Sequence, residues 1–278
     1  MTDRIRIAAA QINPQFMRND YNLNKIQGAS RQAKEKGADL VVFPECALTG
    51  YSFESRDEAV SCAETIPGPA TDSAASLCQE LNLYIIFGLL EEDQGKLFNA
   101  AVLAGPQGLA WKYRKNHVPF QGVDRFVDRG DGPFRVYQVP IGNIGMQICY
   151  DIFFPESARV HALLGADMIA LPTSFATKGV CDRASPIITA RAIENKLHVL
   201  SCNRVGVERD YPFCGLSKIV DPMGVTLAEA SPDREEIIVA ALSLEESRQK
   251  HITHRPGEWE IDRMKDRRPE LYGRIVQA

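Results

Sequence analysis

The chain repeats one pattern of apolar and polar segments twice. Residues 37–45, G-A-D-L-V-V-F-P-E, match residues 165–173, G-A-D-M-I-A-L-P-T. Each segment follows a stretch of helical periodicity and is an apolar run that ends near a proline, which is typical of a buried parallel strand. Residues 9–13 (A-A-Q-I-N) and 145–149 (G-M-Q-I-C) form a second matching pair and predict one more strand in each half.

Two helices are predicted between these strands. Asp20 is expected to cap the first helix and Gly37 to end it, and Pro155 and Gly165 are expected to bound the second. The later segments also keep one order in both halves. They predict helices at 71–77 and 185–191, strands at 83–88 and 197–202, and hairpin turns at 105–108 and 221–224. In the helix at 185–191, Ser185 is expected to be the N-cap and Pro186 the first helical residue.

Each half therefore runs strand, helix, strand, helix, strand, strand. Two such halves bury their apolar faces most completely when their sheets pack face to face with helices outside. We predict an α/β fold, a four-layer α-β-β-α sandwich with an internal pseudo-two-fold repeat. It would form one domain over residues 1–278, with a core of about 4–245. The alternative is two separate α/β domains, but no segment between the halves has the composition of a linker.

Residues 246–278 form a charged tail that has no counterpart in the other half. The tail holds Trp259 and Tyr272. Aromatic and arginine side chains are enriched in subunit interfaces, so the tail either packs across such an interface or covers the core locally.

Composition and charge exclude several classes of protein. The 278 residues carry a net charge of -4 with a pI of about 5.8, which is unlike a nucleic-acid-binding surface. No apolar run approaches the length of a membrane span, and residues 1–12 do not resemble a signal peptide. The seven cysteines are odd in number and include no C-x-x-C pair. We therefore expect no disulfide framework, and a reduced, cytoplasmic protein.

No cofactor or metal is expected. His117 and His198 have no partner ligands nearby in sequence, and no phosphate-binding G-x-x-x-x-G-K motif occurs.

The repeat fails at three predicted strand ends, where open α/β folds build their sites. An acid, a base and a thiol stand where the other half has a neutral residue: Glu45 against Thr173, Lys115 against about Ser231, and Cys149 against Asn13. Each has an ordinary structural interpretation when taken alone, as a helix-capping carboxylate, a solvated lysine or a buried thiol. Their joint occurrence at the exceptions to a duplicated pattern favours one shared site.

The chemistry of the three groups is complementary. A free thiol titrates near 8.5, so a carboxylate within hydrogen-bond reach is needed to take its proton at neutral pH. An ammonium group favours the thiolate and stabilises the oxyanion that forms on an attacked carbonyl. Glu45, Lys115 and Cys149 are therefore candidates for acyl transfer from an amide.

At these residues the sequence resembles the nitrilase superfamily of carbon–nitrogen hydrolases. The segments that carry the resemblance are V-V-F-P-E at 41–45, Y-R-K-N-H at 113–117, I-C-Y-D-I-F-F-P-E at 148–156, N-R-V-G at 203–206 with Glu208, and D-P-M-G at 221–224. The resemblance implies the α-β-β-α fold and assembly into a homodimer or larger homo-oligomer. It also implies a mechanism in which Glu45 is the base and Cys149 forms a thioester. Lys115 and the backbone N–H of Tyr150 would hold the oxyanion.

The sequence departs from the family pattern at one place. Many members carry a second glutamate shortly after the lysine, whereas the segment H-V-P-F-Q-G-V-D-R-F at 117–126 has none. Counting along the chain places Val123 or Asp124 near that slot. Either Asp124 replaces the glutamate with a shorter side chain, or the role is lost.

The residues after Cys149 bear on the substrate. The C-Y-D form resembles amidases and N-carbamoyl-amine hydrolases more than nitrilases. The leading hypothesis is an amidase that releases ammonia from a small aliphatic amide or ω-amide. An N-carbamoyl hydrolase is the first alternative, and a nitrilase or a family-fold binding protein with weak activity is a weaker one.

The expected pocket lies at the same strand ends. Tyr51 and Phe53 follow one strand, and Thr173, Ser174 and Phe175 follow its counterpart; these residues either line the pocket or are loop packing. Lys178 and Arg183 follow next in the chain, where they are either ligands for a substrate carboxylate or solvated charges.

Overall fold

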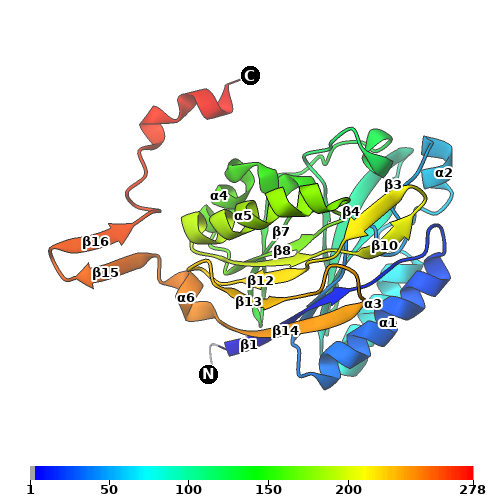
Figure 1. Ribbon diagram of the computed structural model, residues 1–278, viewed down its shortest axis with the longest axis horizontal. Coiled ribbons are helices and arrows are strands. Elements are labelled where there is room, and N and C mark those ends of the chain that lie inside the picture. The colour runs from blue at the N-terminus through cyan, green and yellow to red at the C-terminus, as the bar shows by residue number, and fades with distance from the viewer. Residues whose placement is uncertain (1–3, 278) are drawn as a thin grey trace.

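Two six-stranded sheets pack face to face in the computed structural model, which describes residues 4–277 (Figure 1). The first sheet has the order β14-β1-β2-β3-β4-β5, with β1 (Arg4–Gln11), β2 (Leu40–Val42), β3 (Tyr84–Asp93), β4 (Lys96–Gly105), β5 (Gly108–Arg114) and β14 (Glu236–Ser243). The second has the order β13-β12-β9-β8-β7-β6, with β6 (Val136–Val139), β7 (Gly142–Met146), β8 (Met168–Pro172), β9 (His198–Cys202), β12 (Lys218–Val220) and β13 (Thr226–Glu229).

Helices cover the outer faces of both sheets (Figure 1). The first sheet carries α1 (Asn19–Glu35) and α3 (Pro69–Leu81), and the second carries α4 (Pro155–Leu163) and α5 (Lys178–Asn195). The predicted four-layer α-β-β-α sandwich is confirmed.

The pairing of strands repeats in the two sheets. Strands β1, β2 and β3 are parallel neighbours, as are β7, β8 and β9. Each trio continues through two antiparallel strands, β4 and β5 or β12 and β13, and ends at an antiparallel edge strand, β14 or β6. The order of helices between strands is also the same, so the internal repeat of the sequence is a repeat of topology.

The two faces of β1 show how the layers form. Ile7 and Ala9 belong to the core shared with the second sheet, whereas Ala8 and Ala10 pack with the helices outside the first sheet. Because successive side chains of a strand point to opposite faces, a strand between two layers needs apolar residues at every position. This requirement explains the unbroken apolar run of residues 7–10.

Three local predictions were wrong. Helix α1 begins at Asn19 with Arg18 at the N-cap, so Asp20 lies in the first turn and is not the cap. Helix α5 begins at Lys178, so Pro186 lies inside it and Ser185 is not an N-cap. Burial of Cys181 and Ala184 holds the first turns of α5 in place, and this tertiary packing overrides the local tendency of proline to start a helix.

The expectation of a fully reduced chain was also wrong, because Cys181 and Cys214 form a disulfide. An odd number of cysteines excludes complete pairing but leaves room for one pair. The two residues join the start of α5 to the end of β11 (Tyr211–Cys214), which forms a short hairpin with β10 (Val205–Glu208).

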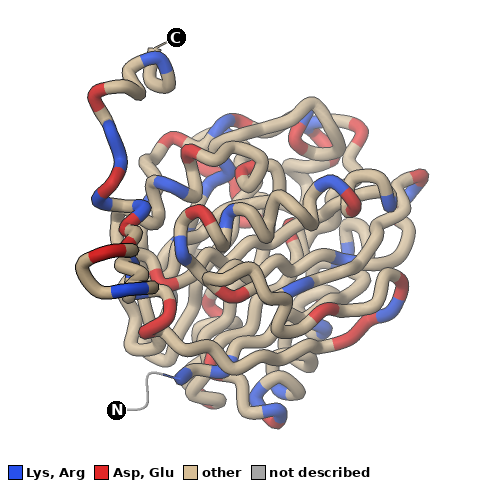
Figure 2. The backbone as a smooth tube through the Cα atoms, turned by 60° about the vertical axis from the view of Figure 1, so that its left-hand side comes forward, with Lys and Arg blue, Asp and Glu red and all other residues tan. Residues whose placement is uncertain are grey.

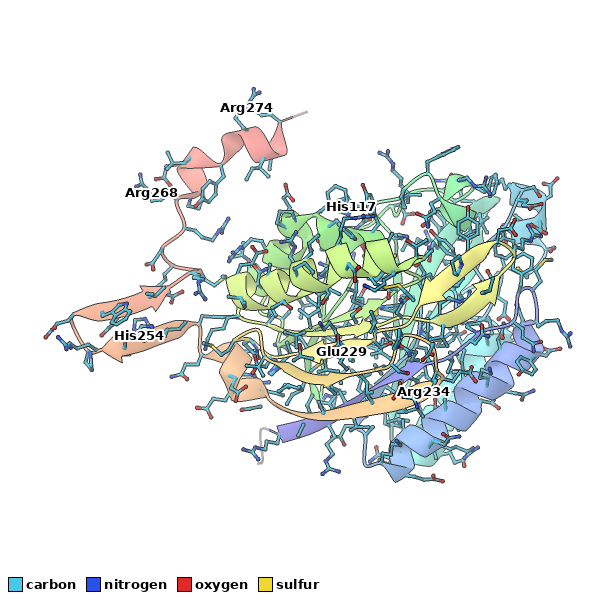
Figure 3. The ribbon with its side chains drawn as sticks, viewed as in Figure 1. His117, Glu229, Arg234, His254, Arg268 and Arg274 are labelled. Atoms are coloured by element: carbon cyan, nitrogen blue, oxygen red, sulfur yellow. A yellow bond between two sulfur atoms is a disulfide. The ribbon has the colours of Figure 1, made fainter. Side chains whose placement is uncertain are left out.

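The C-terminal segment extends away from the sandwich (Figures 1 and 3). After the short helix α6 (Leu244–Arg248), it contains β15 (His251–Arg255), β16 (Trp259–Asp262) and the 3-10 turns η3 (Pro269–Leu271) and η4 (Gly273–Val276). His254, Arg268 and Arg274 lie along this projection, far from His117 on the body. Acidic and basic residues alternate along it (Figure 2).

Within residues 4–277, no helix is long and apolar enough to cross a membrane.

Candidate active site

The four charged or nucleophilic candidates all follow strands or lie in short turns. Glu45 comes shortly after β2, Lys115 directly after β5, and Cys149 opens the 3-10 turn η2 (Cys149–Phe153) after β7. Asp124 lies in a second 3-10 turn, η1 (Gly122–Arg125). Three of these residues therefore come from the first sheet and its loops, and the thiol comes from the second.

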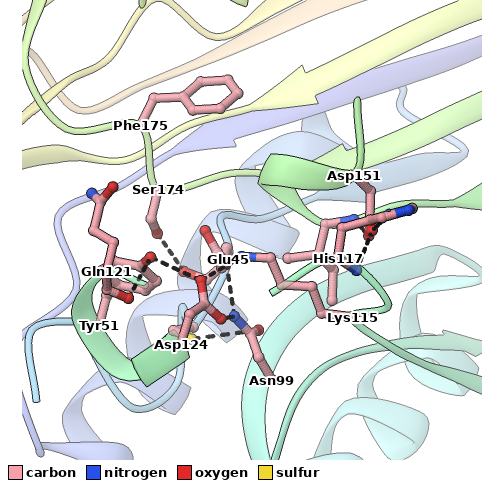
Figure 4. A network of polar contacts seen from close by, with 12 residues as sticks. Glu45, Tyr51, Asn99, Lys115, His117, Gln121, Asp124, Asp151, Ser174 and Phe175 are labelled. Carbon is pink, nitrogen blue, oxygen red and sulfur yellow. Dashed lines mark hydrogen bonds and ion pairs between the residues drawn. The ribbon is translucent and has the colours of Figure 1, made fainter. Parts of the chain in front are cut away.

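A buried ion-pair network joins the three charged residues (Figure 4). The Lys115 ammonium donates to Glu45 Oε1 at 2.7 Å and to Asp124 Oδ2 at 2.6 Å, and all three side chains are fully removed from solvent. Asp124, the candidate for the role of the family's second glutamate, therefore contacts Lys115 directly. The hydroxyl of Tyr51 also donates to Asp124 Oδ2, at 2.9 Å.

Asn99 on β4 is the residue of this network that sequence reasoning missed. Its amide nitrogen donates to Glu45 Oε1 at 2.8 Å and to Asp124 Oδ1 at 2.9 Å, so it holds the two carboxylates in a fixed relation (Figure 4). The available signal was a single polar residue inside the apolar run L-F-N-A-A. A buried polar group in a strand needs a partner, and here its partners are the two carboxylates.

The two oxygens of Glu45 differ in their surroundings. Oε1 accepts hydrogen bonds from Lys115 and Asn99, whereas Oε2 is buried and has no hydrogen-bond partner among the described residues. Leaving a buried carboxylate oxygen unsatisfied costs roughly 1–3 kcal/mol. Such an atom is free to accept a proton from a group that enters or borders the site.

Cys149 sits on a tight turn with a left-handed backbone, at φ +45°. Asp151 fixes this turn: its carboxylate accepts the N–H of Ile148 at 2.9 Å, the hydroxyl of Tyr113 at 2.7 Å and the N–H of His117 at 3.0 Å. The Nδ1 atom of His117 also lies 2.7 Å from Asp151 (Figure 4). The turn that carries the thiol is therefore braced from the end of β5.

The electrostatics keep the thiol neutral at rest. Burial raises the pKa of Cys149 well above its usual range, Glu45 raises this pKa further, and Lys115 opposes the shift. Burial and the charge of Asp124 raise the pKa of Glu45, while Lys115 lowers it, and the net direction is upward. Burial alone would lower the pKa of Lys115, but Asp124 and Glu45 raise it well above its ordinary value.

A small cavity of about 200 Å³ opens at Cys149. Tyr150 lies at its edge with 36% of its surface exposed, and Arg183 of α5 reaches its wall. No carboxylate among the described residues pairs with Arg183. The other lining residues are Tyr51, Pro119, Gln121, Phe153, Ser174, Phe175, Ala176 and Val180.

The remaining predicted residues fall in different places. Phe53 is buried against Phe16, with ring centroids 4.7 Å apart, and is part of the packing below the loop. Thr173 donates its hydroxyl to the carbonyl of Cys202 at 3.2 Å and serves the second sheet. Lys178 is exposed and pairs with Asp182, so only Arg183 of the two basic candidates lines the cavity.

Two other groups near the site were not predicted. The first is the contact between His117 and Asp151, which lie 34 residues apart in the chain. The second group is the buried pair of Arg204 and Glu208, which contacts the loop of Tyr51. Across residues 4–277, no cluster of three or more His, Cys, Asp or Glu side chains is arranged to hold a metal ion.

Comparison with known proteins identifies the family. The sequence profile of the carbon–nitrogen hydrolases matches residues 6–251, so the chain belongs to this family, within the nitrilase superfamily. It is similar to a nitrilase of Pyrococcus abyssi, at 40% identity over 97% of this chain and all of that protein. It is also similar to the omega-amidase NIT2 of Xenopus tropicalis, at 33% identity over 81% of this chain and 83% of that protein.

A solved structure agrees over the whole chain. The carbon–nitrogen hydrolase of Helicobacter pylori G27 superposes with a TM-score of 0.89 at 25% identity, covering 100% of this chain and 99% of that one. The protein is a carbon–nitrogen hydrolase with the sandwich fold of its superfamily.

Proposed function

We propose that this hydrolase is an amidase that cleaves a small amide through a thioester on Cys149. The observation that carries the proposal is the environment of Glu45. One of its oxygens is held by Lys115 and Asn99, and the other is free, in a buried site that it shares with a neutral thiol. A fixed carboxylate with one free oxygen is suited to moving a proton between a thiol and a leaving amine.

The first half of the reaction forms the thioester. As the Cys149 sulfur attacks the amide carbonyl, its proton passes to Glu45 Oε2. The negative charge on the carbonyl oxygen is stabilised by the Lys115 ammonium and the backbone N–H of Tyr150. Glu45 then returns the proton to the nitrogen as the C–N bond breaks, and ammonia leaves.

The second half reverses these roles with water. Glu45 accepts a proton from a water molecule that attacks the thioester carbonyl, and then gives this proton to the departing sulfur. The products are a carboxylic acid and free Cys149. The raised pKa of Glu45 suits this sequence, because it brings the carboxylate closer to neutral pH, where it can both accept and release a proton.

The cavity favours a small substrate that carries a carboxylate. Its volume of about 200 Å³ is below the usual range for drug-sized ligands. Arg183 supplies a cation at the wall, and no carboxylate of the described chain neutralises it. Some relatives are named omega-amidases, and this name agrees with a substrate that carries its amide at the opposite end from a carboxylate.

Intact-protein mass spectrometry during turnover tests the proposal. A panel of small ω-amides should give an acyl adduct on Cys149 together with released ammonia. Cys149→Ala should give neither while keeping its fold, whereas the matched variant Cys62→Ala, altered at a half-buried cysteine outside the cavity, should behave as wild type. Ammonia release by purified Cys149→Ala would refute the assignment.

A nitrile substrate is the second candidate, because the relative with 40% identity is named a nitrilase. Attack on a nitrile gives a thioimidate, which differs in mass from the thioester that an amide of the same acid gives. Release of carbon dioxide together with ammonia would instead identify an N-carbamoyl substrate.

Self-association is part of the proposal. The outer face of α4 exposes Val160, Leu163 and Leu164, and the projecting segment nearby exposes Trp259 and Ile275. These apolar side chains would be removed from water most completely in a contact between the projecting segment and a second copy of the same chain. Leu163→Glu should shift sedimentation toward the monomer, while Val207→Glu, at an exposed apolar position on β10, should not. Unchanged sedimentation of Leu163→Glu would exclude this face.

A further inference from the structure

The hairpin β10–β11 is a place where the two halves of the fold differ. In the first half, β3 ends at Asp93 and β4 begins at Lys96, so a tight turn joins them. In the second half, the corresponding strands β9 and β12 are separated by the whole hairpin. The hairpin is therefore an insertion into the repeated topology, and it contacts the loop of Tyr51.

The hairpin carries a buried carboxylate to the loop that follows Glu45. Glu208, at the end of β10, accepts the backbone N–H groups of Tyr51 and Ser52 on Oε1, both at 2.7 Å. Gly50 has φ +86°, and a Cβ there would lie 3.0 Å from Glu208 Oε2. The loop therefore wraps closely around the carboxylate, and a side chain at position 50 would push it away.

Arg204 holds Glu208 in place. Its guanidinium lies 2.7 Å from Glu208 Oε2, stacks 4.2 Å above the ring of Phe213 and donates to the carbonyl of Pro14 at 3.0 Å. Both members of the pair are buried. A buried carboxylate needs such a partner, and the pair thereby becomes a fixed anchor rather than a solvated contact.

Tyr51 connects this anchor to the charged network. Its hydroxyl donates to Asp124 Oδ2 at 2.9 Å, and its carbonyl accepts the N–H of Val123 at 2.8 Å. A Cβ at Gly122 would lie 2.2 Å from the Tyr51 ring, so the turn η1 fits against that ring only with glycine there. Tyr51 thus places both the backbone and the carboxylate of the turn that carries Asp124.

We propose that Glu208 is a positioning residue for the reaction, acting through Tyr51 and Asp124 on the ammonium of Lys115. The chain of contacts runs from Arg204 to Glu208 and ends at Lys115 Nζ, 2.6 Å from Asp124. Glu208 does not touch the reacting atoms. The inference extends the proposed function, because it assigns the placement of Lys115 to a residue on the inserted hairpin.

Two readouts test the role. One is steady-state kinetics, and the other is the pH dependence of Cys149 alkylation by iodoacetamide, followed by peptide mass with Cys62 as internal reference. Glu208→Gln should lower kcat by about 10- to 100-fold with KM within about twofold, and should shift the alkylation profile. Glu229→Gln removes a carboxylate from an ion pair with Lys218 elsewhere in the same half and should change neither readout.

A double mutant separates positioning from general stabilisation. Tyr51→Phe removes the hydroxyl contact to Asp124 but keeps the backbone N–H that Glu208 accepts. If Glu208 acts through Tyr51, the double variant should be no worse than the poorer single variant. Should Glu208→Gln fail to fold, Glu208→Asp carries the test, since it keeps the charge beside Arg204 and retracts the carboxylate by one methylene.

Three results would overturn the proposal. They are an alkylation profile of the folded Glu208 variant identical to wild type, additive effects of the two substitutions, and a loss in kcat that Glu229→Gln reproduces. If the wild type hydrolyses no amide, nitrile or N-carbamoyl compound, the proposed function fails. The alkylation profile of Cys149 still decides the role of Glu208 in that case.

Discussion

The two halves of the sandwich share a topology but contribute different chemistry. The first half supplies Glu45, Asn99 and Lys115 from the ends or the middle of its strands, and these groups are locked in one buried network. The second half supplies Cys149 on a strained turn. The comparison indicates that the repeated topology supplies matching strand ends, and that the candidate catalytic groups stand where the two halves carry different side chains at those ends.

The equivalent residues Glu45 and Thr173 show this most directly, because they touch each other. The N–H of Glu45 donates to the carbonyl of Thr173 at 3.3 Å, and the hydroxyl of Ser174 donates to the carbonyl of Glu45 at 3.0 Å. The two strand ends therefore meet at the centre of the repeat. One side chain turns to the charged network, and the other bonds to its own sheet.

Among the substitutions considered, removal of the Glu45 charge, in the first half of the fold, should lower the activity most. Glu45→Gln keeps an oxygen for Lys115 and Asn99 but cannot accept the thiol proton, so kcat/KM should fall by about 10³-fold or more. Far-ultraviolet circular dichroism should remain that of wild type. A loss below about tenfold would show that another group takes the proton.

The pH dependence of the wild type should report the same residue. Activity needs Glu45 as a carboxylate, and its pKa is raised by burial and by Asp124. The acid limb of kcat/KM should therefore lie above the value of about 4.3 for an ordinary glutamate, with activity lost as the pH falls through the raised pKa.

Asp124→Asn should have two effects, and its effect on the rate should be smaller than that of Glu45→Gln. It removes one charged partner of Lys115, which should cost about 10- to 100-fold in kcat. It also removes a charge that raises the pKa of Glu45, so the acid limb should move to lower pH. A limb that stays in place while kcat falls would mean that Asp124 positions Lys115 without setting the titration of Glu45.

The smallest effect is expected at the cavity wall of the second half. Arg183→Ala should raise KM about tenfold for an amide that carries a carboxylate and leave a neutral amide unchanged. Lys178→Ala is the matched control, since Lys178 is exposed and already pairs with Asp182. Equal KM changes for both amides would exclude a carboxylate contact at Arg183.

The fold, and the candidate residues Glu45, Lys115 and Cys149, were easier to predict from the sequence than the lining of the cavity. Glu45, Lys115 and Cys149 stood out because a duplicated pattern exposes its exceptions and because each lies in a family-like motif. Phe53 was ambiguous because an apolar residue after a strand packs equally well into a pocket wall or below a loop. Its contact with Phe16 depends on a loop from another part of the chain.

Other features depend on contacts that no local pattern encodes. Asn99 contacts Asp124, 25 residues away in the chain, and Glu208 contacts Tyr51, 157 residues away. The start of α5 follows from packing around Cys181 and not from the Ser185-Pro186 signal. The disulfide between Cys181 and Cys214 needs two segments brought together by the inserted hairpin, which a count of cysteines does not reveal.

The rate at which Cys149 is acylated in Glu45→Gln tests the central claim most directly. Rapid mixing with an amide that the wild type hydrolyses, followed by intact-protein mass spectrometry, would measure this single step. The account predicts that the adduct on Cys149 forms within the first turnover in wild type and about 10³-fold more slowly in Glu45→Gln. Adduct formation at the wild-type rate in Glu45→Gln, or an adduct on a cysteine other than Cys149, would contradict it.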